Sequence, residues 1–519
     1  MRQVVEVVVP YVFMLLNPMN TPWLTPRMKA RTALPAKLRE IFHHQRSQPT
    51  HRMIQQINPV LRGWLNYPRL TTARGMPLLG PSWVIRASLE ERVMSAICEL
   101  SRELYVPHPE PRVGTTVSMA YIGQGLRREE TRSLVRSSDW QDTVTRRTSD
   151  DNGRTWSDWE LLYEQAPTQG EFVQSGGPSQ HGTGPLDPVS GRLVKPVFQR
   201  LVEGSPQVAM REIWSGNRLF CDHGFYQLST DNGRSWGEAC QLRYEDGPIF
   251  DPDHWADPNY YRTNEMYIGN ATVLTNGTVA ICATVPVPYS DPEDAQIPEV
   301  FPNNYRPGCV AGAICFLGRW NAARQDYDWQ ISRPVCLPRR LSTRGLVELD
   351  LSELRSGNLL LLMRGSNTGL DPRQCPARKW FSVSSDGGLT WSSVRDIRYD
   401  TSETLYSPAA ISQTLRSRRT GRLYWIGNIP DQPADGNAPR YPLQIVEIDE
   451  QLPAFRRDTV TVIDDRDPVR DSEHLQLSNF ALLEDRETGV LELYLTRLGE
   501  RGGGPEVWTA DAYRYRLTL

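Results

Sequence analysis

Short apolar runs separated by polar turns fill most of the chain beyond about residue 110. The clearest example comprises Val347–Leu354, a turn at Ser356–Gly357, Leu359–Arg364, a loop and then Lys379–Ser384. Apolar runs of this length, bounded by Gly, Ser and Asn, are typical of antiparallel strands. The pattern predicts a unit of four antiparallel strands, the last starting near Trp391.

The same strand, glycine turn and strand recur elsewhere at a regular interval. The turn glycines are Gly191, Gly277, Gly357, Gly421 and Gly489. Together with a further unit around Val113–Trp156, they predict six units of about 70 residues, as in a radial repeat. We therefore predict an all-β, six-bladed β-propeller of four-stranded antiparallel blades over residues 105–519, with a short helical N-terminal extension over residues 1–100.

A repeated turn motif supports this count. The phrase Ser-x-Asp-x-Gly-x-Thr/Ser-Trp, here called the Asp box, occurs at Ser149–Trp156, Ser229–Trp236 and Ser384–Trp391. Its Asp can accept bonds from backbone N–H groups, its Gly supplies positive φ, and its Trp can cover the hairpin. The Asp residues lie 231 − 151 = 80 and 386 − 231 = 155 residues apart. The second spacing is nearly double the first, so an eroded copy is expected near Val310–Trp320.

Composition limits the partners and cofactors. The formal net charge of −3 argues against nucleic-acid binding by the propeller. The eight Cys show no metal-ligand spacing, and the acidic clusters Asp464–Asp467 and Asp251–Asp253 are expected to be solvated loops. We expect no metal, no cofactor and a monomer.

The first hundred residues differ from the rest. Val4–Leu16 is apolar but carries Glu6 and Pro10, which makes it too short for a membrane span and poor as a signal peptide. We therefore expect no membrane association and, by default, a cytoplasmic location. Residues 1–75 carry eleven Lys and Arg against two Glu, a balance of +9. Such a basic stretch could bind RNA phosphates.

Lys37–Tyr67 resembles the maturase-specific domain of group II intron reverse transcriptases, most clearly over Ile57–Trp64 with Asn66 and Tyr67. The resemblance implies binding to intron RNA. No polymerase domain with a paired-Asp motif accompanies it. We favour a vestigial or mispredicted fusion, with a working RNA-binding module as the alternative.

From about Arg112 to the C-terminus, the repeats with their Asp boxes resemble the sialidase (neuraminidase) superfamily. The resemblance implies an exo-acting glycoside hydrolase that releases a terminal sialic or related acidic sugar. In that superfamily three Arg side chains clamp the sugar carboxylate. A Tyr made basic by a neighbouring Glu attacks, and an Asp serves as general acid and base.

The best match lies in the fourth unit. The superfamily has a Glu followed sixteen residues later by a clamp Arg, and Glu348 and Arg364 have that spacing (364 − 348 = 16). The resemblance implies a catalytic role for Glu348 and substrate binding by Arg364. The alternative is that Arg364 caps a loop or pairs with Asp350.

The remaining roles fall on other units. The third clamp Arg is expected at Arg440, and the first has Arg112 as its nearest candidate. The acid/base Asp is expected at Asp139, with Asp142 in reserve. A plain loop carboxylate is the alternative for both Asp residues.

The nucleophile is the main departure. The aligned Tyr position reads Leu477, and Tyr406 heads the wrong blade to replace it. One interpretation is a hydrolase with an unusual nucleophile or with water. The other is a sialidase-like propeller with different chemistry, either a uronic-acid polysaccharide lyase or hydrolase or a non-catalytic glycan-binding protein. Histidines available for such chemistry are His181, His223, His254 and His474.

If the N-terminal resemblance marks a fusion, deletion of residues 1–100 leaves the propeller folded. The thermal midpoint of unfolding then changes by less than about 3 °C, and RNA retention in a gel-shift assay is equally weak for the full chain and the truncated one. RNA binding by the full chain alone would contradict the fusion and support a working module.

Overall fold

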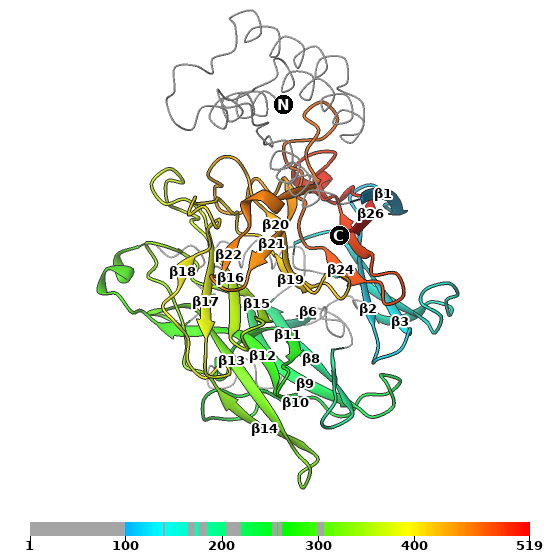
Figure 1. The fold of residues 1–519 in the computed structure, drawn as a ribbon, viewed down its shortest axis with the longest axis vertical. Coiled ribbons are helices and arrows are strands. Elements are labelled where there is room, and N and C mark those ends of the chain that lie inside the picture. The colour runs from blue at the N-terminus through cyan, green and yellow to red at the C-terminus, as the bar shows by residue number, and fades with distance from the viewer. Residues whose placement is uncertain are drawn as a thin grey trace, which may run out of the picture. The chain divides into compact units, whose positions relative to one another are not determined.

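The structure is a computed structural model that describes residues 99–138, 141–164, 172–175, 184–203, 220–251, 257, 262–297 and 306–519. Contacts divide the chain into Met1–Met94 and Ser95–Leu519. The described residues, all in the second unit, contain strands and short 3-10 turns but no α-helix. They form six antiparallel sheets, the blades of a six-bladed β-propeller (Figure 1). The predicted helical extension lies outside the described residues.

The blades follow one another along the chain. Blade 1 contains β2 (Gly114–Tyr121), β3 (Arg128–Val135), β4 (Thr143–Ser149) and β5 (Glu160–Glu164). Blade 2 contains β6 (Phe172–Ser175), β7 (Leu186–Asp187), β8 (Arg192–Glu203), β9 (Phe220–Ser229) and β10 (Cys240–Gln241). Blade 3 contains β11 (Tyr267–Val273), β12 (Val279–Pro288), β13 (Cys309–Asn321) and β14 (Asp326–Ile331), with the turn η2 (Pro292–Gln296).

The second half continues in the same way. Blade 4 contains β15 (Val347–Glu353), β16 (Leu359–Arg364), β17 (Lys379–Ser384) and β18 (Arg395–Asp396). Blade 5 contains β19 (Gln413–Arg416), β20 (Leu423–Asn428), β21 (Leu443–Asp449), β22 (Ala454–Phe455) and β23 (Thr461–Asp464), with the turn η3 (Arg457–Thr459). Blade 6 contains β24 (Ala481–Glu484), β25 (Leu491–Thr496), β26 (Ala512–Thr518) and β1 (Glu99–Val106), with the turn η4 (Gly504–Trp508). The four strands predicted from Val347 onward are those of blade 4.

Blade 6 is closed by the first described strand of the chain. β1 pairs antiparallel with β26, from Glu99 opposite Thr518 to Val106 opposite Ala512. The propeller therefore takes in residues ahead of the predicted boundary at residue 105. This pairing makes β1 the outermost strand of blade 6 and joins the two ends of the repeat into one ring.

The core consists of apolar layers between neighbouring blades. On β16, Leu359 and Leu361 pack into a cluster shared with blade 3, whereas Leu360 and Leu362 pack into one shared with blade 5. Successive residues of a strand face opposite sides, so a strand between two blades buries both faces. This is why β16 is a continuous apolar run rather than an alternating one.

The three Asp boxes form the turns between the third and fourth strands of blades 1, 2 and 4. In the first, Thr155 donates to Asp151 through its backbone N–H (2.8 Å) and its hydroxyl (2.6 Å), and the Ser149 hydroxyl donates at 2.8 Å. These bonds, chiefly from Thr155, lower the pKa of the Asp151 carboxyl to about 2. The Trp156 indole N–H donates to Gly153 O at 3.0 Å. In blade 3 the equivalent β13–β14 turn lies between Asn321 and Asp326, just after the segment Val310–Trp320 predicted for the eroded copy, which is strand β13 itself.

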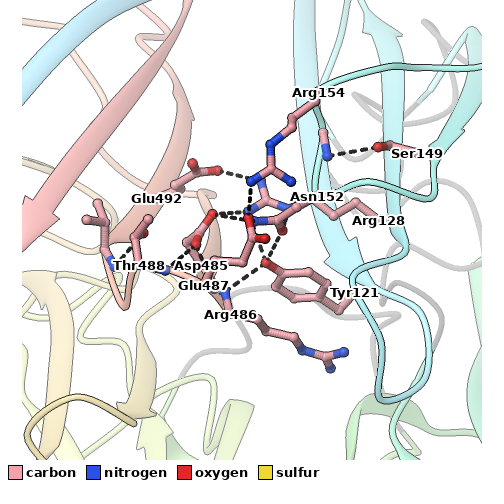
Figure 2. Close-up of polar contacts among 12 residues, drawn as sticks. Tyr121, Arg128, Ser149, Asn152, Arg154, Asp485, Arg486, Glu487, Thr488 and Glu492 are labelled. Carbon is pink, nitrogen blue, oxygen red and sulfur yellow. Dashed lines mark hydrogen bonds and ion pairs between the residues drawn. The ribbon is translucent and has the colours of Figure 1, made fainter.

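A buried ionic network joins blade 1 to blade 6 (Figure 2). Arg128, which is 3% exposed, bonds Asp485 (2.5 Å) and Glu492 (3.1 Å) from the β24–β25 hairpin. Arg128 also donates to Tyr121 and to Asn152 of the first Asp box. Four hydrogen bonds from one Arg thereby hold two blades together, next to the hairpin that the box stabilises.

Removing the central cation of this network should destabilise the ring. Arg128→Met leaves the Asp485 and Glu492 carboxylates buried and unpaired, so we expect the free energy of unfolding to fall by about 3–5 kcal/mol in urea titration. Arg154→Met is the matched control, because Arg154 pairs with Glu487 at the exposed edge of the same network (62% and 34% side-chain exposure) and should cost less than about 1 kcal/mol. Equal losses for both variants would contradict this account.

Candidate active site

A cavity of about 740 Å³ lies where the inner parts of all six blades meet. Its lining includes, one from each blade in order, Thr116, Arg200, Tyr267, Glu348, Gln413 and Thr496. A volume of this order suits a ligand of one or a few sugar rings. The end of each inner strand faces this space rather than a neighbouring blade, which is why polar side chains gather here.

A β-bulge places Glu348 in the cavity. The pairing of β15 with β16 shifts between Val347 and Asp350, and Glu348 lies in the left-handed region with φ of +50°. A non-glycine residue in this region carries backbone strain, and bulges commonly re-aim side chains beside active sites. The bulge sets the Glu348 carboxylate against the guanidinium of Arg364, the last residue of β16.

The Glu348–Arg364 pair keeps unused hydrogen-bonding capacity. Arg364 Nη1 bonds Glu348 Oε1, and Arg364 Nη2 donates to Asn437 Oδ1 at 3.2 Å. Arg364 Nε and Glu348 Oε2 are buried and have no hydrogen-bond partner in the protein. Unsatisfied buried polar atoms are costly, so a donor and an acceptor left open on one ion pair point to a ligand.

Arg440 lies beside this pair and shares Asn437 with it. Arg440 Nε donates to the Asn437 backbone oxygen at 3.1 Å, while its Nη atoms donate to Gln476 Oε1 (3.1 Å), Ser478 Oγ (3.3 Å) and Ala409 O (3.1 Å). Most of its N–H groups are thus used within the protein. Arg440 orders the Asn437 loop and adds positive charge to the cavity, while Arg364 has more donors free.

A second pair of carboxyl groups lines the cavity from blades 2 and 3. Asp222 of β9 accepts two bonds of 2.7 Å from Arg200, so its charge is matched. Glu265, just ahead of β11, has a side chain only 5% exposed, with Arg262 Nη1 at 3.6 Å. Its Oε2 is buried and has no hydrogen-bond partner. Burial raises the pKa of Glu265 to about 8, although Arg262 opposes the shift.

Two further buried ionisable groups lie next to the Glu348–Arg364 pair. Burial raises the pKa of Asp350 to about 6, although Thr414 donates its N–H to Oδ2 at 2.6 Å. Burial lowers the pKa of Lys379 to about 8, and its Nζ donates to Ala410 O at 3.0 Å. The charge at Glu348 and Arg364 therefore sits in a low-dielectric environment that strengthens its electrostatic effect.

The residues predicted from the sequence are only partly brought together. Glu348, Arg364 and Arg440 line the cavity. Arg112 does not join them: it lies before β2 with φ of +66°, its side chain is 65% exposed, and its Nε donates to Glu506 at 2.9 Å. Asp139 lies outside the described residues. Asp142 is bound by Arg136 at 2.9 Å and is not part of the cavity lining.

The structure also explains the departure at Leu477. The Leu477 side chain is fully buried in the apolar layer between blades 5 and 6, while its neighbours Gln476 and Ser478 line the cavity. Tyr406 is not part of the lining and instead lies under the Arg378 guanidinium, 5.1 Å from its ring centroid. Tyr267 is the one Tyr among the described lining residues.

The histidines mostly have structural environments. His223 is buried and stacks on Phe250 with ring centroids 3.8 Å apart. His474 is the one His among the described lining residues. His181 and His254 lie outside the described residues. Within the described part of the chain, no cluster of His, Cys, Asp or Glu is arranged to hold a metal ion.

Sequence reasoning missed Glu265, Tyr267 and the cavity-lining Arg200 and Arg344. A usable signal existed for the first two, since Glu265 and Tyr267 precede the Gly277 turn much as Glu348 precedes the Gly357 turn. Position at the start of the first strand of each unit predicts exposure to the axis. No signal marked Arg200, which lies within a long strand.

Comparisons with known proteins agree with both resemblances. Residues 31–77 match the family model described as group II intron, maturase-specific domain. No curated protein sequence matches the chain. Among the described residues, no helix has the length and apolar character needed to cross a lipid bilayer.

The similar solved structures are sialidases. NanB sialidase from Streptococcus pneumoniae is 10% identical with a TM-score of 0.47, over 80% of this chain and 71% of that one. A Hadza microbial sialidase is 14% identical with a TM-score of 0.46, over 78% and 65%. Trypanosoma rangeli sialidase is 11% identical with a TM-score of 0.43, over 80% and 59%. At these values no residue role is transferred from them.

The raised pKa of Glu265 predicts a pH-dependent stability. The folded state keeps the proton up to about pH 8 whereas the unfolded chain loses it near its ordinary value, so stability falls as pH rises through this window, by at most about 1.4 kcal/mol per pH unit. Glu265→Gln removes this dependence. Urea titrations at pH 5, 6, 7 and 8 should show the wild type losing stability relative to the variant, with the exposed Glu473→Gln as a control that follows the wild type. Parallel curves for wild type and Glu265→Gln would contradict the assignment.

Proposed function

We propose that this protein is an exo-acting glycoside hydrolase that releases a terminal sialic or related acidic sugar bound in the central cavity. The observation that carries the proposal is the Glu348–Arg364 pair, raised into the cavity on a strained bulge with Arg364 Nε and Glu348 Oε2 left without partners. An Arg with free donors recognises a carboxylate through charge-assisted bonds.

A group of three Arg on one side of the cavity supports an acidic substrate. Arg344, Arg364 and Arg440 all line the cavity on the side of blades 4 and 5. Arg440 and Asn437 place further polar groups beside Arg364, so a sugar carboxylate there would meet cationic and amide donors together. In this proposal Arg364 and Arg440 bind substrate, and Arg112 takes no part in binding because it pairs with Glu506 at an exposed position.

The attacking group in this proposal is a water molecule. Leu477 cannot attack and is buried in the core. Glu348 lines the cavity, its Oε2 has no hydrogen-bond partner and its carboxylate is held by Arg364, so in this proposal it takes a proton from an attacking water. The sequence resemblance places the acid/base role on Asp139, which lies outside the described residues.

Leu477 cannot attack and is buried in the core, which favours one competing function, a glycan-binding propeller without turnover. Both functions use the Arg364 site, so both require binding of an acidic sugar. They differ in whether free acidic sugar is released.

Arg364→Ala should abolish substrate recognition. With a fluorogenic aryl sialoside we expect kcat/KM to fall at least about 100-fold, because the variant loses charge-assisted bonds to the carboxylate. Arg112→Ala should keep wild-type activity, since that side chain does not line the cavity. Acidic-sugar binding by calorimetry without any product would support the binding protein instead, and activity in Arg364→Ala equal to wild type would exclude this site.

A further inference from the structure

Glu265 is a cavity-lining carboxyl group that the substrate-binding pair does not use. We propose that Glu265 is the general acid of the reaction, protonating the leaving-group oxygen while Glu348 removes a proton from the attacking water. This inference rests on the proposed hydrolase function, and it assigns to a blade 3 residue a role that the sequence resemblance places on Asp139.

The backbone around Glu265 is held from two sides. Glu265 forms an isolated antiparallel bridge with His223, and the next residue, Met266, donates its N–H to Asp222 O at 2.8 Å. β11 then begins at Tyr267, and both Met266 and Tyr267 line the cavity with Glu265. A carboxyl group on such a rigid support keeps its position through the reaction, as a proton donor requires.

Asp222 and Glu265, the two carboxyl groups that line the cavity from blades 2 and 3, differ in their hydrogen bonding. Both oxygens of Asp222 accept hydrogen bonds from Arg200, whose charge balances that of the carboxylate. Glu265 has no such bidentate partner: its Oε2 lies 3.6 Å from Arg262 Nη1, beyond hydrogen-bonding distance, and accepts no hydrogen bond. An oxygen that is buried, unbonded and beside a cavity is best accommodated as the protonated acid, whose O–H can be donated to a ligand.

The electrostatic surroundings of Glu265 agree with this protonation. The charged groups that face it are Arg262, Asp222, Arg306 and Glu245. Arg306 forms an ion pair with Glu245, and Asp222 is matched by Arg200, so Arg262 is the main positive charge that opposes desolvation. Burial consequently raises the pKa of Glu265 to about 8. At neutral pH the residue carries the proton that a leaving alkoxide needs.

Glu348 provides the complementary base on the adjacent blade. Its carboxylate is ion-paired with Arg364. Blade 3 contacts blade 4 at Gly269, which packs against the backbone oxygen of Leu349. Glu348 is ion-paired, whereas Glu265 is buried without a hydrogen bond to Oε2, and two carboxyl groups in such different environments can divide the acid and base roles.

The step balances without a further reactant. The water oxygen bonds the anomeric carbon, the bond from that carbon to the leaving oxygen breaks with its electron pair, Glu348 accepts the water proton and Glu265 gives its proton to the leaving oxygen. Exchange with solvent then returns both carboxyl groups to their starting states. Because water attacks from the face opposite the leaving group, the sugar is released with inverted anomeric configuration.

The decisive experiment compares leaving groups in the full-length protein. An aryl sialoside expels an acidic phenol that needs little protonation, whereas a sialoside of a neutral sugar expels a basic alkoxide. Glu265→Gln should lower kcat/KM about 100-fold or more on the sugar-linked substrate but less than about 10-fold on the aryl one. The alkaline fall in wild-type kcat/KM near pH 8 should be lost in the variant.

Two control variants test whether the effect is specific. Asp222→Asn alters the neighbouring carboxyl group on the same side of the cavity and should change kcat/KM for both substrates by the same factor. Asp139→Asn should also leave unchanged the ratio of kcat/KM on the sugar-linked substrate to kcat/KM on the aryl one. If Asp139→Asn shows the leaving-group dependence and Glu265→Gln does not, the assignment to Glu265 is overturned.

Failure of the inference is distinguishable from failure of the proposed function. If the wild type releases sugar from neither substrate, the hydrolase function falls and this inference with it. If the wild type is active but Glu265→Gln affects both substrates alike, only the acid role falls. Proton NMR of the first product should show inversion, and retention would overturn the attack by water.

Discussion

The pairing of β1 with β26 is the constraint on which the remainder of the structure depends. Each blade is a twisted sheet of four or five strands whose apolar faces stay exposed until another blade covers them. The ring covers every face only if its last blade meets its first, and blade 6 is completed by a strand from the other end of the repeat. Arg128, buried between blades 1 and 6, links the same closure to the first Asp box.

Closure also creates the site. Along most of its length a strand such as β16 is covered on both faces and carries only apolar side chains. At the axis no further blade can cover the inner ends of the strands, so polar groups from all six blades meet in one cavity. The bulges of β11 and β15 lie at this inner edge, where regular pairing is no longer required and a strained residue such as Glu348 can be held.

The two sides of the cavity differ in their charge and in the hydrogen bonding of their ionisable side chains. On the side of blades 4 and 5, Arg364 and Arg440 share Asn437 and present positive charge. On the side of blades 2 and 3, the charge of Asp222 is cancelled by Arg200, and Glu265 stays buried without a hydrogen bond to Oε2. This asymmetry separates a place suited to an anion from a place suited to a neutral acid, which is the division of labour that glycoside hydrolysis uses.

Much of the architecture was readable from the chain because it depends on local chemistry. The Asp boxes are turns closed by their own side chains, so their spacing counts blades, and the first three strands of blade 4 were predicted almost to the residue. The spacing of Glu348 and Arg364 was readable for the same reason, since both belong to one hairpin. Arg112 was misleading because a basic residue near the start of a blade has no local feature that shows whether it faces the axis or, as here, Glu506.

The linear pattern of this chain therefore determines its strands, its turns and the number of its blades, all of which arise from contacts within about one repeat. Which side chains share the cavity was decided by closure of the ring, because it brings together residues hundreds of positions apart and buries some of them without partners. Glu265 shows the difference: in the sequence it is an ordinary Glu before a strand. Its altered acidity comes from desolvation by neighbouring blades, a property that no stretch of sequence possesses alone.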